Sequence, residues 1–212
     1  MDGRTDFEKY ASGTKTLENF LVHPQGAATR RVGTQHIAEV KDSSKKTRLI
    51  PFEFSTTQTY IMEFGDQYIR FYKDKGQIVS GGSAYEISSP FLEAELFDIK
   101  FAQSADVMYL CHPNHDVRKL SRTGHTSWTL ATVSFTQSGG ATITISGASN
   151  RPSCVSFFEQ RLVFANTINN PQTLWFSKAG DYENFTTGSN ADDAMIYTIA
   201  SNQVNAIQYL KA

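Results

Sequence analysis

The sequence predicts a mainly β fold: a partial β-propeller-like array of antiparallel blades that follows a short helical N-terminal segment. The first observation is that residues 154–185 divide into short apolar runs separated by turn residues, which is typical of antiparallel strands. The second is that this arrangement recurs, because about 56 residues separate Phe101 from Phe157 and Gly124 from Gly180. The third is the abundance of aromatic residues, 15 Phe and 9 Tyr, which stabilise neighbouring strands as cross-strand pairs.

The recurrence divides the chain into an N-terminal segment, residues 1–47, and incomplete propeller-like blades over residues 48–212. Units of three or four strands at this period are typical of propellers. The alternative is a β-sandwich with coincidental hairpins. The blades cover approximately residues 48–97, 98–150 and 151–203, and a fourth begins at Val204.

The N-terminal segment contains two stretches that can form short helices. Residues from Asp6 to Ala11 can form one or two helical turns, and residues from Thr14 to Leu21 can form another turn or two. In the second stretch Leu17, Phe20 and Leu21 fall on one helical face, which predicts an amphipathic turn.

Two adjacent arginines, Arg30 and Arg31, stand in a loop flanked by glycines. Paired guanidiniums can clamp carboxylates of a neighbouring chain, and Glu18 or Asp6 of another subunit are candidate partners. We therefore expect subunit contacts at Arg30, Arg31 and Glu18, while the alternative is a solvated loop.

Alternating apolar and polar residues predict the first strand of the first blade. In Arg48–Phe54 the side chains of Ile50, Phe52 and Phe54 point to one face, which indicates a half-buried strand. A hairpin from Thr59 to Tyr72 follows, and Phe91–Phe97 is expected to be one helical turn or extended chain that leads into the next blade.

The later blades repeat the pattern with different loops. Residues 137–150 contain a Thr/Ile run between Gly-Ser turns, which predicts an added strand or arm between two blades. Other expected strands are Thr34–Val40 in the N-terminal segment and Val117–Ser121, Val155–Phe158, Arg161–Ala165, Thr173–Ser177 and Ala194–Ile199 in the blades.

Composition limits the class of protein. The 212 residues carry a net charge of −1 with acids and bases interspersed, so no basic tract indicates nucleic-acid binding. The two cysteines, Cys111 and Cys154, are expected to be buried, reduced thiols of a protein assembled in a cytoplasm. The polar N-terminus indicates no secretion signal, and no apolar run approaches the roughly 20 residues that span a bilayer, so no membrane is expected.

Metal, cofactor and catalytic sites are weakly indicated. No second cluster completes a coordination shell around the histidines of the second blade, so we expect a polar loop there and no metal or other cofactor. Neither is a nucleophile elbow present, and adjacent carboxylates on a loop are ordinarily solvated, so we expect no catalytic residues. The residues weighed are Cys111, His112, His115, Asp116 and His125 for a metal, and the acid pairs Asp181 with Glu183 and Asp192 with Asp193 for catalysis.

Four stretches together carry a resemblance to a known family. They resemble the N-terminal part of the bacteriophage tail nozzle family, also called tail tubular protein B, whose relatives are described as phage neck, hub or stabilisation proteins. The resemblance covers nearly the whole chain. The stretches are DFEKYASGTKTLENFLVHPQGAATRRVGTQHIAEV (Asp6 to Val40), RLIPFEFSTTQTYIMEFGDQYIRFY (Arg48 to Tyr72), KLSRTGHTSWTL (Lys119 to Leu130) and FFEQRLVFANTINNPQTLWFSKAGDYENFTTG (Phe157 to Gly188).

The resemblance implies a structural virion protein with no catalysis. Members of the family form a hexameric ring below the portal and adaptor, with a platform, a β-propeller and a distal tube through which DNA leaves. For this chain the resemblance implies a homo-oligomeric ring that contacts portal, adaptor and other tail proteins. DNA would pass through its channel without sequence-specific binding. The protein would be assembled in the bacterial host cytoplasm and reside in the phage or prophage tail, with residues 1–47 in the platform.

Two other functions compete with this expectation. A propeller-type glycoside hydrolase would need acids and arginines that converge at the centre of the blades. A glycan- or protein-binding propeller would need aromatic side chains such as Trp128 or Trp175 to face solvent, whereas a tryptophan in a strand is more often part of a core.

Overall fold

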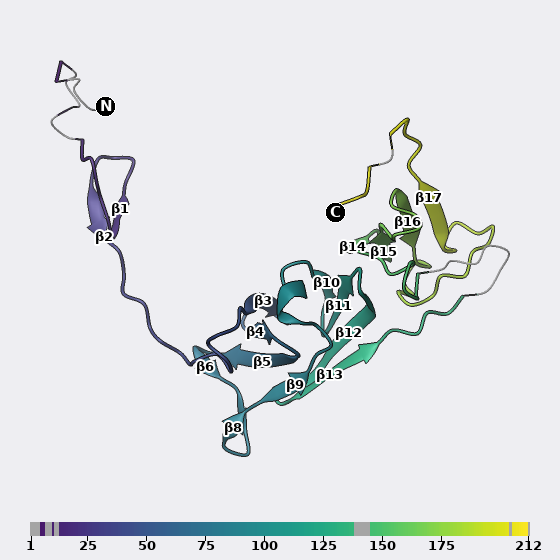
Figure 1. Cartoon of the computed structure of the whole chain (residues 1–212), viewed down its shortest axis with the longest axis horizontal. Helices are drawn as coiled ribbons and strands as arrows, with labels where there is room; N and C mark the ends of the chain where they lie inside the picture. The colour runs from purple at the N-terminus through teal and green to yellow at the C-terminus, as the bar shows by residue number, and fades with distance from the viewer. Residues whose placement is uncertain (1–4, 7–9, 11–12, 138–144, 204, 212) are drawn as a thin grey trace. The chain divides into compact units, whose positions relative to one another are not determined.

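The computed structural model describes residues 5–6, 10, 13–137, 145–203 and 205–211 of the chain (Figure 1). The chain separates into two compact units, Met1–His36 and Ile37–Ala212. The mainly β fold built of antiparallel sheets is confirmed. Within the described residues, no helix is long and apolar enough to cross a bilayer.

The first unit contains a hairpin of two short strands, β1 (Phe20–Val22) and β2 (Ala28–Arg30), all of whose residues are exposed. The helix expected over Thr14–Leu21 is wrong, because residues 13–19 are irregular and the strand begins at Phe20. Asn19 has a φ of 61°, which is incompatible with a right-handed helix, and pairing with β2 satisfies backbone groups that helical bonds would have used. The strand expected over Thr34–Val40 is also wrong, because these residues are irregular. The other expected turns, Asp6–Ala11, fall mostly on residues outside the described part.

The second unit begins with a sheet of five antiparallel strands in the order β3-β4-β5-β6, with β9 also paired to β5. Ile50 and Phe52 are buried as their alternation predicts, whereas Phe54 lies beyond the strand and is exposed. The last residue of β4 is Gly65, where a Cβ would lie 2.2 Å from the Tyr68 ring, so the close approach requires a glycine. The strands are β3 (Arg48–Glu53), β4 (Thr59–Gly65), β5 (Tyr68–Lys73), β6 (Gly76–Gln77) and β9 (Glu86–Ser88), with a small hairpin of β7 (Val79–Ser80) and β8 (Ser83–Ala84).

A single turn of 3-10 helix, η2 (Glu93–Glu95), connects the first sheet to two four-stranded meanders, in which each strand pairs with the next along the chain. The second sheet contains β10 (Lys100–Ser104), β11 (Val107–His112), β12 (His115–Gly124) and β13 (Ser127–Thr132). The third contains β14 (Cys154–Phe158), β15 (Arg161–Ala165), β16 (Thr173–Phe176) and β17 (Met195–Thr198). The strand expected within 137–150 falls largely on residues 138–144, which lie outside the described part.

The second sheet is shared between two hydrophobic cores. Along β11, Met108 and Leu110 are buried against the first sheet, whereas the alternate residues Tyr109 and Cys111 are buried against the third. A strand exposes successive side chains on opposite faces, so this fully apolar run is what a sheet covered on both sides requires. The three sheets are therefore stacked in chain order (Figure 1).

The first strands of the three sheets lie next to one another. β10 packs against β14, and Gln103 of β10 exchanges hydrogen bonds with the backbone of Glu53 at the end of β3, at 3.1 and 2.9 Å. The sheets do not close into a ring, so the structure shows an open array and not a propeller. Residues 205–211, where a fourth blade was expected to begin, carry no strand, although Ile207 bonds to Pro171 next to the third sheet.

Candidate functional site

The expected subunit contacts lie on the exposed hairpin of the first unit. Arg30 ends β2 opposite Phe20, and Arg31 donates a side-chain hydrogen bond to Asn19 at 3.3 Å as well as a backbone bond to the same residue. Within the described residues neither guanidinium is ion-paired, and Glu18 is also exposed. Both charges are therefore accessible to an external partner.

The structure brings together two of the histidines considered as metal ligands and places beside them an acid that sequence reasoning missed. His112 and His115 are cross-strand partners at the β11–β12 turn, and Glu95 reaches them from η2. The ligand atoms of the three side chains all lie within 4.8 Å of one another, and His115 Nε2 is 2.7 Å from a Glu95 oxygen. Such a trio has the donor set that zinc accepts.

The hydrogen bonds of the trio argue against a pre-formed metal centre. The backbone amide of Asn114 donates to His112 Nδ1 at 3.1 Å, which places the proton of the neutral ring on Nε2 and leaves no free lone pair. Burial lowers the pKa of His112 and keeps it neutral. Burial alone would raise the pKa of Glu95, but bonds from Leu92, Asn114 and His115 together lower it to about 2. Glu95 therefore links η2 to the hairpin through its hydrogen bonds with Asn114 and His115.

The other residues considered as metal ligands contact different parts of the fold. His125 Nδ1 is 2.7 Å from the Tyr60 hydroxyl, and Asp116 accepts from Arg151 at 3.1 Å. Cys111 is fully buried, and burial raises the pKa of its thiol, as it does for Cys154. Both cysteines are free, as expected.

Three of the four carboxylates considered for catalysis are held by cations, whereas Asp181 is exposed and forms no ion pair within the described residues. Glu183 accepts from Lys119 at 2.5 Å and from the Tyr109 hydroxyl at 2.9 Å, so it ties the loop of the third sheet to the second sheet. Lys178 lies 3.2 Å from Asp192 and 3.5 Å from Asp193. The hydrogen bond from Lys178 lowers the pKa of Asp192, which keeps this acid ionised. These contacts give the acids a structural role.

The two tryptophans belong to different cores. Trp128 is 5% exposed among aromatic residues of the first core, and Trp175 is 3% exposed in the second. Neither presents a ring to solvent, so the feature that a glycan-binding surface needs is missing at both positions.

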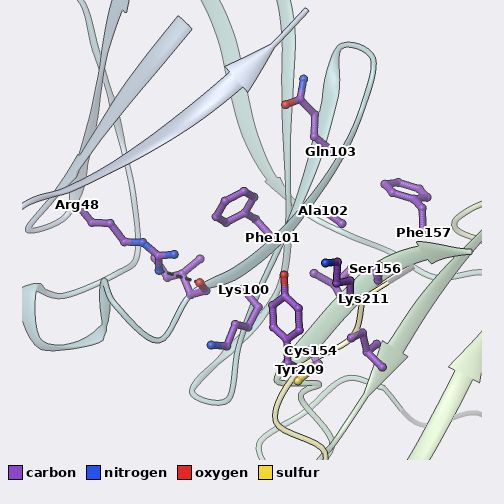
Figure 2. A pocket seen from close by; sticks show the side chains of 13 residues that line it. Arg48, Lys100, Phe101, Ala102, Gln103, Cys154, Ser156, Phe157, Tyr209 and Lys211 are labelled. Atoms are coloured by element: carbon purple, nitrogen blue, oxygen red, sulfur yellow. Dashed lines mark hydrogen bonds between the residues drawn. The ribbon is translucent and has the colours of Figure 1, made fainter. Parts of the chain in front are cut away.

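A hollow of about 520 Å³ lies where β10 and β14 meet the C-terminal segment (Figure 2). Its charged lining consists of Arg48, Lys100 and Lys211, and no Asp or Glu of the described residues lines it. Phe101, Phe157 and Tyr209 contribute rings, and Figure 2 shows Tyr209 with its hydroxyl directed toward β10. Sequence reasoning missed this hollow because its residues come from four segments, each about 50 positions from the next.

The sequence was also compared with known proteins. No protein-family model matches it, and no curated protein is significantly similar to it.

Proposed function

We propose that the chain is a structural component of a phage or prophage tail, part of the nozzle or neck around the DNA-exit channel, with no catalytic role. The observation that carries this proposal is the open stack of three similar antiparallel sheets, arranged in chain order around two cores. Adjacent first strands and face-to-face sheets are also how propeller blades are arranged. We propose accordingly that the three sheets are successive blades of a propeller in the assembled particle.

Both ends of the stack carry uncovered apolar surface, which supports a role in assembly. On the outer face of the third sheet Phe158, Met195 and Tyr197 are 49%, 45% and 61% exposed. On the outer face of the first sheet Leu49 and Ile61 are 63% and 41% exposed. Contiguous exposed apolar faces in a folded protein mark surfaces that are covered by another element or partner.

The hairpin of the first unit is the proposed subunit contact. A two-stranded hairpin is marginally stable by itself, and this one exposes Phe20, Leu21 and Val22 at 47%, 57% and 68%. Packing against a neighbouring subunit would bury these side chains. Arg30 and Arg31 at its end would then meet carboxylates such as Glu18 of that neighbour.

By this proposal the homo-oligomer is a ring, six-membered as the resemblance implies, in contact with portal, adaptor and other tail proteins. DNA crosses its channel without sequence-specific binding. Glu183 and Asp192 are held in ion pairs, and Asp181 is exposed on a loop, so no observation of the structure favours a glycoside hydrolase.

Native mass spectrometry and negative-stain microscopy of the purified chain test the assembly. We expect rings for the unmodified chain, and at least a tenfold weaker association for Arg30→Glu/Arg31→Glu, because two cation contacts become repulsive. Lys46→Glu/Lys75→Glu is the control, since it reverses two exposed lysines outside the hairpin that form no ion pair within the described residues. A chain that stays monomeric at every concentration, or a control that weakens association equally, contradicts the proposal.

A further inference from the structure

The hollow between β10, β14 and the C-terminal segment combines cations with aromatic rings and contains no opposing acid among its described lining residues. Within the described part of the chain, no ion pair engages Lys100 or Lys211. Arg48 donates Nη1 to the carbonyls of Leu96 and Ile99, both at 2.8 Å, and stays fixed at the edge of the hollow. The described lining of the hollow therefore has a net positive charge.

The C-terminal wall of the hollow is held in place by specific contacts. The Ile207 carbonyl accepts from Asn166 Nδ2 at 2.9 Å and from Cys154 Sγ at 3.4 Å, and the Ile207 amide donates to Pro171 at 3.0 Å. These bonds position Tyr209 and Lys211, which follow two to four residues later, beside β14. Tyr209 is 69% exposed, so one face of its ring is open to a ligand.

We propose that this hollow binds a nucleotide, either free or as one unit of a single strand. Lysine ammonium groups bind phosphate as point charges, and aromatic side chains stack on bases of any sequence. Lys100 and Lys211 supply the charges and Tyr209 supplies the stacking face. A volume of about 520 Å³ lies within the usual range of small-ligand sites, roughly 300–1,000 Å³.

Three probes separate the parts of this site: inorganic phosphate, adenosine monophosphate, and a fluorescein-labelled ten-nucleotide thymidine strand. Calorimetry measures the first two and fluorescence anisotropy measures the third, at low and moderate salt. We expect the monophosphate to bind more tightly than phosphate alone, because stacking adds to the charge contact. Binding of both nucleotide probes falls as salt rises, because the phosphate contact is screened.

Substitutions of the lining residues test which side chains contact the nucleotide. Lys100→Gln and Lys211→Gln should each weaken the monophosphate roughly tenfold, the effect of losing one charged hydrogen bond, and Tyr209→Ala should weaken it by a similar factor. Lys75→Gln is the matched control, because this lysine is exposed at the β5–β6 turn and does not line the hollow. Circular dichroism confirms that each variant is folded.

Several results would overturn the inference. These are no binding of any probe, equal affinity for phosphate and monophosphate, or equal weakening by Lys75→Gln. If the affinity for the thymidine strand is unchanged in Tyr209→Ala, the strand is held by charge attraction alone and the hollow is not a nucleotide site. If adenosine monophosphate binds as tightly as the strand, the ligand is a free nucleotide. If the strand binds more tightly, the ligand is a single-stranded polymer. Both results support a nucleotide site in the hollow. None of these readouts depends on ring formation, so a monomeric chain leaves the test valid.

Discussion

The indole of Trp128 is the clearest test of the first core. Its ring stacks on Phe71 at 4.3 Å between centroids and meets the edges of Phe52 and Tyr60 at 4.9 and 5.2 Å. Its Nε1 donates to the His125 carbonyl at 3.1 Å. Trp128→Ala removes all of these contacts and leaves a cavity beneath β13, so the stack of the first two sheets loses its largest shared side chain.

The expected loss follows from the area that the ring buries. An aromatic side chain buries roughly 150–250 Å², which at about 25 cal/mol per Å² is worth about 4–6 kcal/mol. Measured Trp→Ala changes in cores cost about 3–5 kcal/mol, so we expect a loss near 4 kcal/mol in the free energy of unfolding. A domain is stable by only about 5–15 kcal/mol, so the midpoint of urea unfolding should fall markedly.

Urea unfolding followed by far-ultraviolet circular dichroism measures this loss. Trp128→Ala leaves Trp175 as the only tryptophan, so its fluorescence reports the second core of the same variant. Because β11 contributes to both cores, the fluorescence and dichroism transitions should shift together. Phe97→Ala is the control, since this aromatic ring is 59% exposed, and its free energy should change by less than about 0.5 kcal/mol. A loss below about 1 kcal/mol for Trp128→Ala, or a Trp175 transition that does not move, would refute the shared-sheet reasoning.

Two further predictions concern buried polar groups. Burial lowers the pKa of His112, so the unfolded chain binds this proton more readily, and stability should decline as pH falls below the ordinary histidine value of about 6.5. His112→Asn keeps an acceptor for the Asn114 amide and should flatten urea midpoints between pH 7.5 and 5.5, whereas an unchanged slope would contradict this. Glu63 is 1% exposed and accepts hydrogen bonds from the hydroxyls of Tyr68, at 2.5 Å, and Tyr72. Burial and the bond to Glu63 raise the pKa of Tyr72 to about 12. Glu63→Ala should cost about 1–3 kcal/mol by urea unfolding because both hydroxyls lose their acceptor, and Glu53→Ala, an exposed acid, serves as the control.

Local chemistry explains where the sequence predicted the fold well. Ile50 and Phe52 alternate with polar neighbours and are buried, and the runs of β15 and β16 are bounded by turn residues. These signals depend only on neighbours along the chain. The N-terminal helix failed for the same reason, because the apolar spacing around Phe20 fits a helix locally, whereas pairing with Ala28–Arg30 makes it a strand.

The candidate sites were less predictable because they join distant segments. The histidine turn was visible in the sequence, but Glu95 comes from a different element about 20 positions away. In the hollow, Lys100 and Lys211 lie on segments that no local pattern relates. Neither lysine differs in its sequence context from an ordinary surface lysine.

The sequence by itself determined most of the longer strands from Arg48 onward, their turns and the recurrence of antiparallel units, because alternation and turn chemistry act over a few residues. Only the tertiary structure decided that the β10–β13 sheet is covered on both faces, and which acids are neutralised by Lys119 and Lys178. The physical reason is that burial of a face and pairing of a charge depend on which sheets stack, and stacking is settled by contacts between residues far apart in the chain.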